Sequence, residues 1–209
     1  MINRTEKGIY YLHNYIPSRN FSKHSDEENE ESKMMWAYKD GSDPKVSLKY
    51  TKELMQAIAE LSQDMVAEKI GLVAVPPSKV EKYSPIRESI KQIADWYRLG
   101  IAKNMYHCNK MILDCGNLIF RTHDIPTSHN ERRATYKEQM DSLSCKRDEL
   151  SKLWTTFIIL DDVTTTGKSL DACRNVLLDH GAVSKYIYRM AIAKTYEEDP
   201  WKILEDLPF

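Results

Sequence analysis

The stretch FIILDDVTTTGKSLDA, residues 157–172, constrains the fold more than any other part of this chain. The apolar run that ends at Leu160 predicts a buried strand. A helix is predicted next, because apolar residues recur at helical spacing up to Gly181, a typical helix end: Leu170, Cys173, Val176 and Leu177. A strand that passes through a short polar turn into a helix is typical of an α/β fold.

The rest of the chain continues this alternation. A first helical stripe follows Thr51, its predicted N-cap, and ends before Gly71, and a second one runs from Ile86 to Tyr97 and ends before Gly100. The predicted strands are 72–75, which stops at a proline pair, 117–120, 155–160 and 186–193. The order predicts an α/β domain with a mostly parallel sheet flanked by helices.

Two polar segments interrupt the pattern. Residues 18–33 are acidic and contain no core residues, so we expect a mobile loop there. We therefore divide the chain into an N-terminal extension, 1–35, and a main domain, 36–209. Residues 121–150 form a second long polar segment, partly helical from Glu131, and a loop of this length inside a compact domain is usually functional.

Composition excludes several classes of protein. With 30 basic and 31 acidic residues the net charge is -1, so nucleic acid is not an expected partner. No apolar run is long enough to span a membrane, and the start lacks a signal-peptide pattern, so we expect a cytoplasmic protein. The four cysteines form no C-x-x-C pair, which argues against a zinc ribbon. The aromatic start, IYYLHNY, suits core packing or a homodimer contact better than base stacking.

The turn after residue 160 has the chemistry of an anion site. The first N–H groups of a helix have no partner within it and attract phosphate. Gly167 lets a ligand approach the backbone, and the hydroxyls of Thr165, Thr166 and Ser169 add donors. A Walker-type P-loop is disfavoured, because its first glycine would fall at Asp162.

The two acids of this turn suggest the other half of the ligand. Asp161 and Asp162 can accept hydrogen bonds from vicinal hydroxyls or hold Mg²⁺ through water. A sugar that carries a phosphate satisfies both halves of the site. The alternative is a purely structural turn with a capping threonine.

The stretch IILDDVTTTGKSL resembles the phosphoribosyl-pyrophosphate motif of the type I phosphoribosyltransferases. LVAVPPSK, FRTHDIPTSHNERR and WAYKDG are similar to segments of the competence-protein-like (ComF-like) branch of that family, in the same order. The resemblance runs from about Trp36 to Thr195. The zinc ribbon of that branch is missing, and KYSPIRES replaces its usual run after the proline pair, which leaves Lys82 and Arg87 without clear equivalents.

The resemblance implies a type I phosphoribosyltransferase-like fold and a reaction in which an acceptor, commonly a nucleobase nitrogen, displaces pyrophosphate from phosphoribosyl pyrophosphate with Mg²⁺. It implies that Asp161 and Asp162 hold the ribose hydroxyls or the metal and that Ser78 and Lys79 meet the pyrophosphate. The residues implied around the 5′-phosphate are Thr164, Thr165, Thr166, Gly167, Lys168 and Ser169. Arg121, a catalytic candidate, Arg132 and Arg133 are implied to close over the pyrophosphate and exclude water.

Three functions stay open from the sequence. The first is an active transferase with an unidentified acceptor. The second is a non-catalytic module that senses phosphoribosyl pyrophosphate or a nucleotide. The third, a role in DNA uptake or processing, rests on the competence resemblance alone, and the near-neutral charge gives it no support.

Overall fold

The computed structural model describes residues 2–126, 134–146 and 156–196. The strands are β1 (Asn3–Arg4), β2 (Ile9–Tyr15), β3 (Lys69–Ala74), β4 (Met111–Asp114), β5 (Ile119–Arg121), β6 (Leu143–Cys145), β7 (Thr156–Thr164) and β8 (Ile187–Thr195). The α-helices are α1 (Asp26–Asp40), α2 (Pro44–Gln63), α3 (Pro85–Arg98), α4 (Ile101–Tyr106), α5 (Tyr136–Asp141) and α7 (Lys168–Asp179), with 3₁₀ turns η1 (Ser18–Lys23) and η2 (Ser184–Tyr186).

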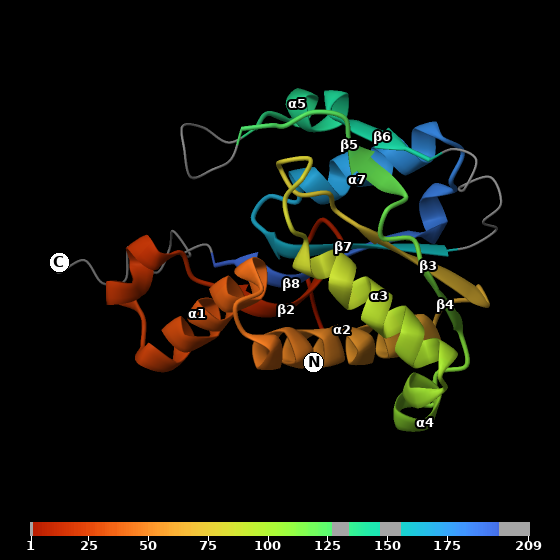
Figure 1. Ribbon diagram of the computed structural model, residues 1–209, viewed down its shortest axis with the longest axis horizontal. Coiled ribbons are helices and arrows are strands. Elements are labelled where there is room, and N and C mark those ends of the chain that lie inside the picture. Colours follow the sequence, from red (N-terminus) through yellow and green to blue (C-terminus); the bar gives the residue numbers. More distant parts are fainter. Residues whose placement is uncertain (1, 127–133, 147–155, 197–209) are drawn as a thin grey trace.

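The main sheet confirms the predicted α/β class. Its six strands lie in the order β1-β2-β8-β7-β3-β4, and all neighbouring pairs are parallel except β1 and β2. Helices α1, α2 and α3 cover one face, with α4 packed against α2 and α3, and α7, α5 and the small antiparallel β5–β6 sheet cover the other (Figure 1). In the described part of the chain, no helix is both long and apolar enough to cross a membrane.

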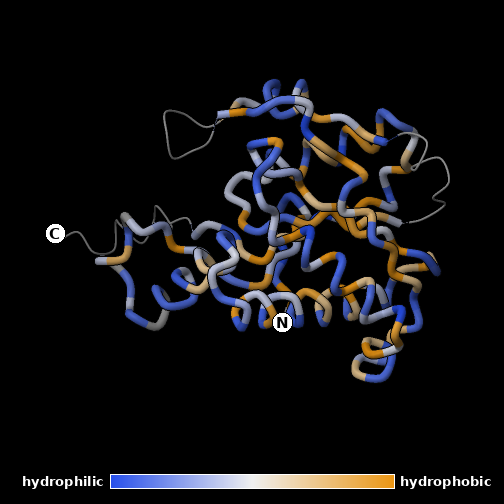
Figure 2. The backbone as a smooth tube through the Cα atoms, in the orientation of Figure 1, coloured by the Kyte–Doolittle hydropathy of each residue, from blue (hydrophilic) through white to orange (hydrophobic). Residues whose placement is uncertain are grey.

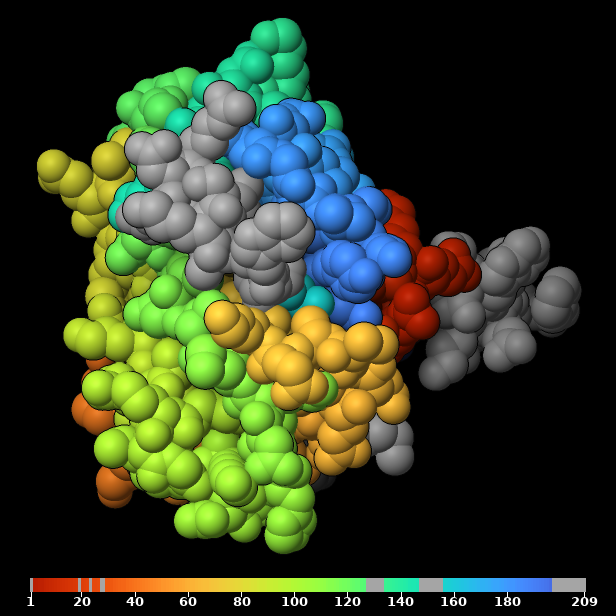
Figure 3. Space-filling model, turned by 90° about the vertical axis from the view of Figure 1, so that its right-hand side faces the viewer, coloured from red at the N-terminus to blue at the C-terminus, as the bar shows by residue number. Residues whose placement is uncertain are grey.

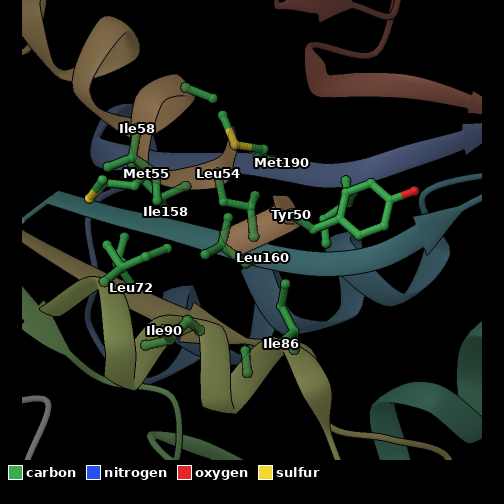
Figure 4. Close-up of a cluster of buried hydrophobic side chains, with 14 of the residues drawn as sticks. Tyr50, Leu54, Met55, Ile58, Leu72, Ile86, Ile90, Ile158, Leu160 and Met190 are labelled. Carbon is green, nitrogen blue, oxygen red and sulfur yellow. The ribbon is translucent and has the colours of Figure 1, made fainter. Parts of the chain in front are cut away.

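The core has two halves, because strand side chains alternate between the faces of a sheet. In β7, Ile158 and Leu160 pack toward α2 and α3, whereas Phe157 and Ile159 pack toward α7. Figure 4 shows the first half, in which side chains from α2, β3, α3, β7 and β8 meet. Apolar residues are concentrated along the central strands in Figure 2, which explains why these strands were readable from the sequence.

The N-terminal part is not a separate extension. Strand β2 pairs with β8, and Ile9 is buried, so this part completes the main sheet. The expected loop at 18–33 is wrong, because it contains η1 and more than half of α1. Its polar residues are used internally: Ser32 Oγ accepts a hydrogen bond from the backbone N–H of Ile16 at 2.9 Å. The expected boundary after residue 35 falls inside α1.

Three other features of the fold differ from the prediction. Helix α2 begins at Pro44, not after Thr51, because the Asp43 carboxylate caps it by accepting from Lys45 N at 2.8 Å. Gly71, expected beyond the helix, lies inside β3. The strand expected at 117–120 is β5, which pairs with β6 outside the main sheet.

The side of the molecule shown in Figure 3 is formed by the α3–α4 region and the C-terminal part of α7, with the start of β3 between them. This is where the parallel strands begin. The functional groups discussed below follow the opposite, carboxyl ends of β3 and β7.

Candidate functional site

A cavity of about 400 Å³ opens beside the carboxyl ends of β3 and β7. From β3 the chain runs outward to β4 by way of α3, and from β7 it runs the other way to β8 by way of α7. Helices α3 and α7 lie on opposite faces of the sheet (Figure 1). This reversal between adjacent parallel strands is the point at which open α/β sheets bind ligands.

The β7–α7 turn forms one wall of the cavity. Residues 161–169 all line it. Gly167 precedes the first residue of α7 with φ 80° and ψ 2°, a left-handed conformation that favours glycine. A Cβ built on Gly167 would lie 2.4 Å from Ile9 Cδ1, so strand β2 packs tightly beneath the turn. The start of a twelve-residue helix, with its unpaired N–H groups, thus borders the cavity.

Polar contacts hold this turn from outside. Thr165 Oγ1 and Thr195 Oγ1 share a hydrogen bond of 2.8 Å, and Lys7 Nζ donates to Thr166 O at 3.4 Å. Arg189 on β8 forms an ion pair with Asp171 in the first turn of α7. The turn is therefore anchored by β8 and by the N-terminal hairpin.

The two acids lie at the end of β7 and not in the loop after it, because the parallel pairing with β8 continues to Thr164. By strand alternation Asp161 lies on the α7 side and Asp162 on the opposite side, where Lys39 Nζ is 3.5 Å from its Oδ1. Both carboxylates still line the cavity. They therefore border the cavity from the two faces of the strand end.

The acid pair is electrostatically unfavourable. Burial first, and then the charge of Asp162, raise the pKa of Asp161 to about 7, although Lys39, the backbone N–H of Asp162 and Arg121 act in the opposite direction. Asp161 Oδ1 accepts from the backbone N–H of Asp162 at 2.9 Å. A half-buried carboxylate that lines a cavity and has a raised pKa is a feature common at functional sites.

The turn after β3 also lines the cavity. Pro76, Pro77 and Ser78 line the cavity, and the turn is tied to residues 121–126 by Ile125 N donating to Ser78 O at 2.9 Å. A second link joins Val80 N to Asp124 Oδ1 at 2.8 Å. Ser78 therefore lines the cavity in a turn that residues 121–126 hold in place.

Arg121 lines the cavity but is occupied by protein partners. Its guanidinium donates to Pro77 O at 2.7 Å, to Pro76 O at 3.5 Å, to Gln139 Oε1 at 2.8 Å and to Ser142 Oγ. Only 6 % of the residue is exposed, and burial lowers its pKa. In this arrangement Arg121, on β5, links the proline turn to α5 and to Ser142, the residue before β6.

The other expected residues have different outcomes. Lys79 is exposed and does not line the cavity. Arg132 and Arg133 lie outside the described residues. Thr164, Thr165, Thr166, Gly167, Lys168 and Ser169 all line the cavity, with Thr164 and Gly167 buried.

Several lining residues were not predicted as site residues. Lys39 comes from the last turn of α1, within the WAYKDG segment that carried the resemblance without a role. Lys82 and Tyr83 follow the proline turn, and the Tyr83 ring lies so close to Gly41 that a Cβ there would be 2.9 Å from its Cε1. Apolar lining is added by Pro85, Ile86, Ile125 and Pro126.

Among the described residues no cluster of three or more His, Cys, Asp or Glu side chains is placed to hold a metal ion. Asp161 and Asp162 suit a Mg²⁺ ion whose remaining ligands come from a bound phosphate, since Mg²⁺ commonly takes one or two carboxylates together with substrate phosphates. No family model matches the chain, and a search of curated proteins finds no matching relative.

Proposed function

We propose that this protein binds phosphoribosyl pyrophosphate with Mg²⁺ and transfers the phosphoribosyl group to a nucleobase-type acceptor, releasing pyrophosphate. The main observation behind the proposal is that one wall of the cavity contains both the acid pair, Asp161 and Asp162, and the start of α7, which Gly167 precedes. A sugar phosphate needs both, and they are adjacent in the turn that resembles the type I phosphoribosyltransferase motif.

The residues then have separate tasks. The N–H groups that begin α7, with Thr165, Thr166 and Ser169, bind the 5′-phosphate. Asp161 and Asp162 bind the ribose hydroxyls or the metal from the two sides of β7. The turn at Ser78, which lines the same cavity, binds the pyrophosphate. The lysines that line the cavity add positive charge around it: Lys39, Lys82 and Lys168.

The proposed reaction depends mainly on how the protein positions the two reactants. The bond between the anomeric carbon and pyrophosphate breaks, with its electron pair leaving on pyrophosphate, while a bond forms from an acceptor nitrogen, whose proton passes to water. Bound Mg²⁺ would supply charge to stabilise the leaving pyrophosphate. The protein holds the sugar between two walls and presents fixed donors to the developing negative charge.

A second candidate is a non-catalytic module that senses phosphoribosyl pyrophosphate or a nucleotide. The observation that favours it is Arg121, whose hydrogen bonds to the proline turn, Gln139 and Ser142 already occupy the guanidinium. Both candidates require the same sugar-phosphate site, and only the transferase requires pyrophosphate release.

Calorimetry with phosphoribosyl pyrophosphate and Mg²⁺ tests the shared site, comparing wild type with the double variant Asp161→Asn, Asp162→Asn. We expect saturable binding that the double variant loses. A screen of nucleobases for pyrophosphate release then separates the candidates. Absence of binding to the wild type refutes both, and binding without release for any base supports the sensor.

A further inference from the structure

Lys39 lies inside the proposed site. Its Nζ is 3.5 Å from Asp162 Oδ1, and 41 % of the Lys39 side chain and 23 % of the Asp162 side chain are exposed. Both side chains line the cavity. The ammonium group therefore stands where a ligand for the acid pair would arrive.

The charges around the pair explain this placement. Burial disfavours a charge on Lys39, but the attraction of Asp162 and then Asp161 outweighs it, and the pKa of Lys39 is raised. Arg121 is directed instead to main-chain and neutral side-chain acceptors. Within the described part of the chain, Lys39 is the only cation in an ion pair with either acid, so two adjacent carboxylates face one ammonium group.

We propose that Lys39 is a tethered counter-cation: in the free protein its ammonium holds the place beside Asp162 that the divalent cation of a metal–phosphate ligand takes on binding. The inference rests on the proposed function. The divalent ion itself carries twice the charge of the ammonium that it replaces, and when a phosphate supplies its other ligands it needs only one or two carboxylates. The displaced ammonium, on a flexible four-carbon stem, can then pair with anionic oxygens of the ligand.

This exchange would make the site selective. Free metal must displace Lys39 without a phosphate to complete its coordination, so it binds weakly. Metal bound to a phosphorylated sugar gains both the acid pair and the helix start. Lys39 therefore favours the complex over the bare ion, and this selectivity can be measured without any turnover.

The test uses Mn²⁺ alone, a paramagnetic substitute for Mg²⁺, with free Mn²⁺ followed by electron paramagnetic resonance. We expect Lys39→Met to bind Mn²⁺ at least about tenfold tighter than wild type, because one positive charge close to Asp162 is removed. Lys39→Arg, which keeps the charge, should remain near wild type. Lys45→Met is the matched control, since Lys45 is exposed on α2 and does not line the cavity.

Adding Asp162→Asn to Lys39→Met should abolish the gain, which would locate the bound Mn²⁺ at this pair. Circular dichroism checks that each variant is folded, and Lys39→Gln replaces Lys39→Met if the latter is not. Equal Mn²⁺ affinity in wild type and the neutral Lys39 variant would overturn the inference. This failure is distinct from that of the proposed function, which depends on phosphoribosyl pyrophosphate binding to the wild type and not on Mn²⁺ alone.

Discussion

Replacing Gly167 with alanine should damage the fold and the site through two separable effects. The left-handed backbone, with φ 80°, costs a residue with a Cβ about 1–2 kcal/mol. The new Cβ would also lie 2.4 Å from Ile9 Cδ1, and overpacking of this kind costs about 1–3 kcal/mol. The smaller entropy of the unfolded alanine chain returns about 0.4–1 kcal/mol. We therefore expect Gly167→Ala to lower the free energy of unfolding by about 2–4 kcal/mol.

A double-mutant cycle with Ile9→Val separates the two effects. Valine lacks the Cδ1 atom, and the next Ile9 atom, Cγ1, would be 3.9 Å from the new Cβ, an ordinary contact. Alone, Ile9→Val should cost about 0.5–1.5 kcal/mol. With Gly167→Ala it should recover about 1–3 kcal/mol relative to additivity, as measured by urea unfolding. Additive losses would show that Ile9 does not restrict this turn and would refute the reasoning.

Three further variants test the site. Asp161→Asn should be more stable than wild type at pH 8 by on the order of a few kcal/mol. Because the pKa of Asp161 is raised to about 7 by folding, wild-type stability should fall as pH rises from about 4 to 7, and urea titrations at several pH values should show the advantage of the variant shrinking toward pH 5. Arg121→Lys should lose about 2–4 kcal/mol of unfolding free energy, because lysine cannot reproduce the fork of hydrogen bonds; unchanged stability with lost ligand binding would instead assign Arg121 to the ligand. Lys82→Ala should weaken phosphoribosyl pyrophosphate binding in calorimetry more than Lys79→Ala, since Lys82 lines the cavity and Lys79 does not; the reverse order would contradict the described geometry.

The elements that the sequence predicted well share one property. Such a strand is apolar on both faces, and such a helix carries one clear apolar stripe. Strand β7 and helix α7 are of this kind, and so the turn between them was placed correctly. Strand β2 is the stretch IYYLHNY, whose aromatic residues suggested core packing or a homodimer contact, but it was assigned to an N-terminal extension because the acidic segment 18–33 separates it from the main domain. In the fold His13 Nε2 lies 2.7 Å from Glu53 Oε2, so this histidine of β2 is paired within the protein.

The candidate site was predictable where its residues are consecutive and unpredictable where they come from distant segments. Residues 161–169 act together because they share one turn. Lys39 reaches the same cavity only because α1 packs near the end of β7, and no local pattern reports that packing. Arg121 shows a related limit: a sequence identifies an arginine but not whether its donors will be used by neighbouring carbonyls.

The pairing of β2 with β8 has a consequence for how this protein acquires its structure. Tyr15 is matched with Thr195, so the sheet joins segments at nearly opposite ends of the described chain. Contacts of such large sequence separation form slowly, because the entropy of closing the intervening chain is lost before they stabilise anything. During synthesis, the support that Ile9 gives beneath Gly167 cannot be locked in until β8 has left the ribosome. The cavity wall at Gly167 is therefore expected to form late in folding, and a sugar phosphate should bind only to chains in which β2 and β8 are already paired.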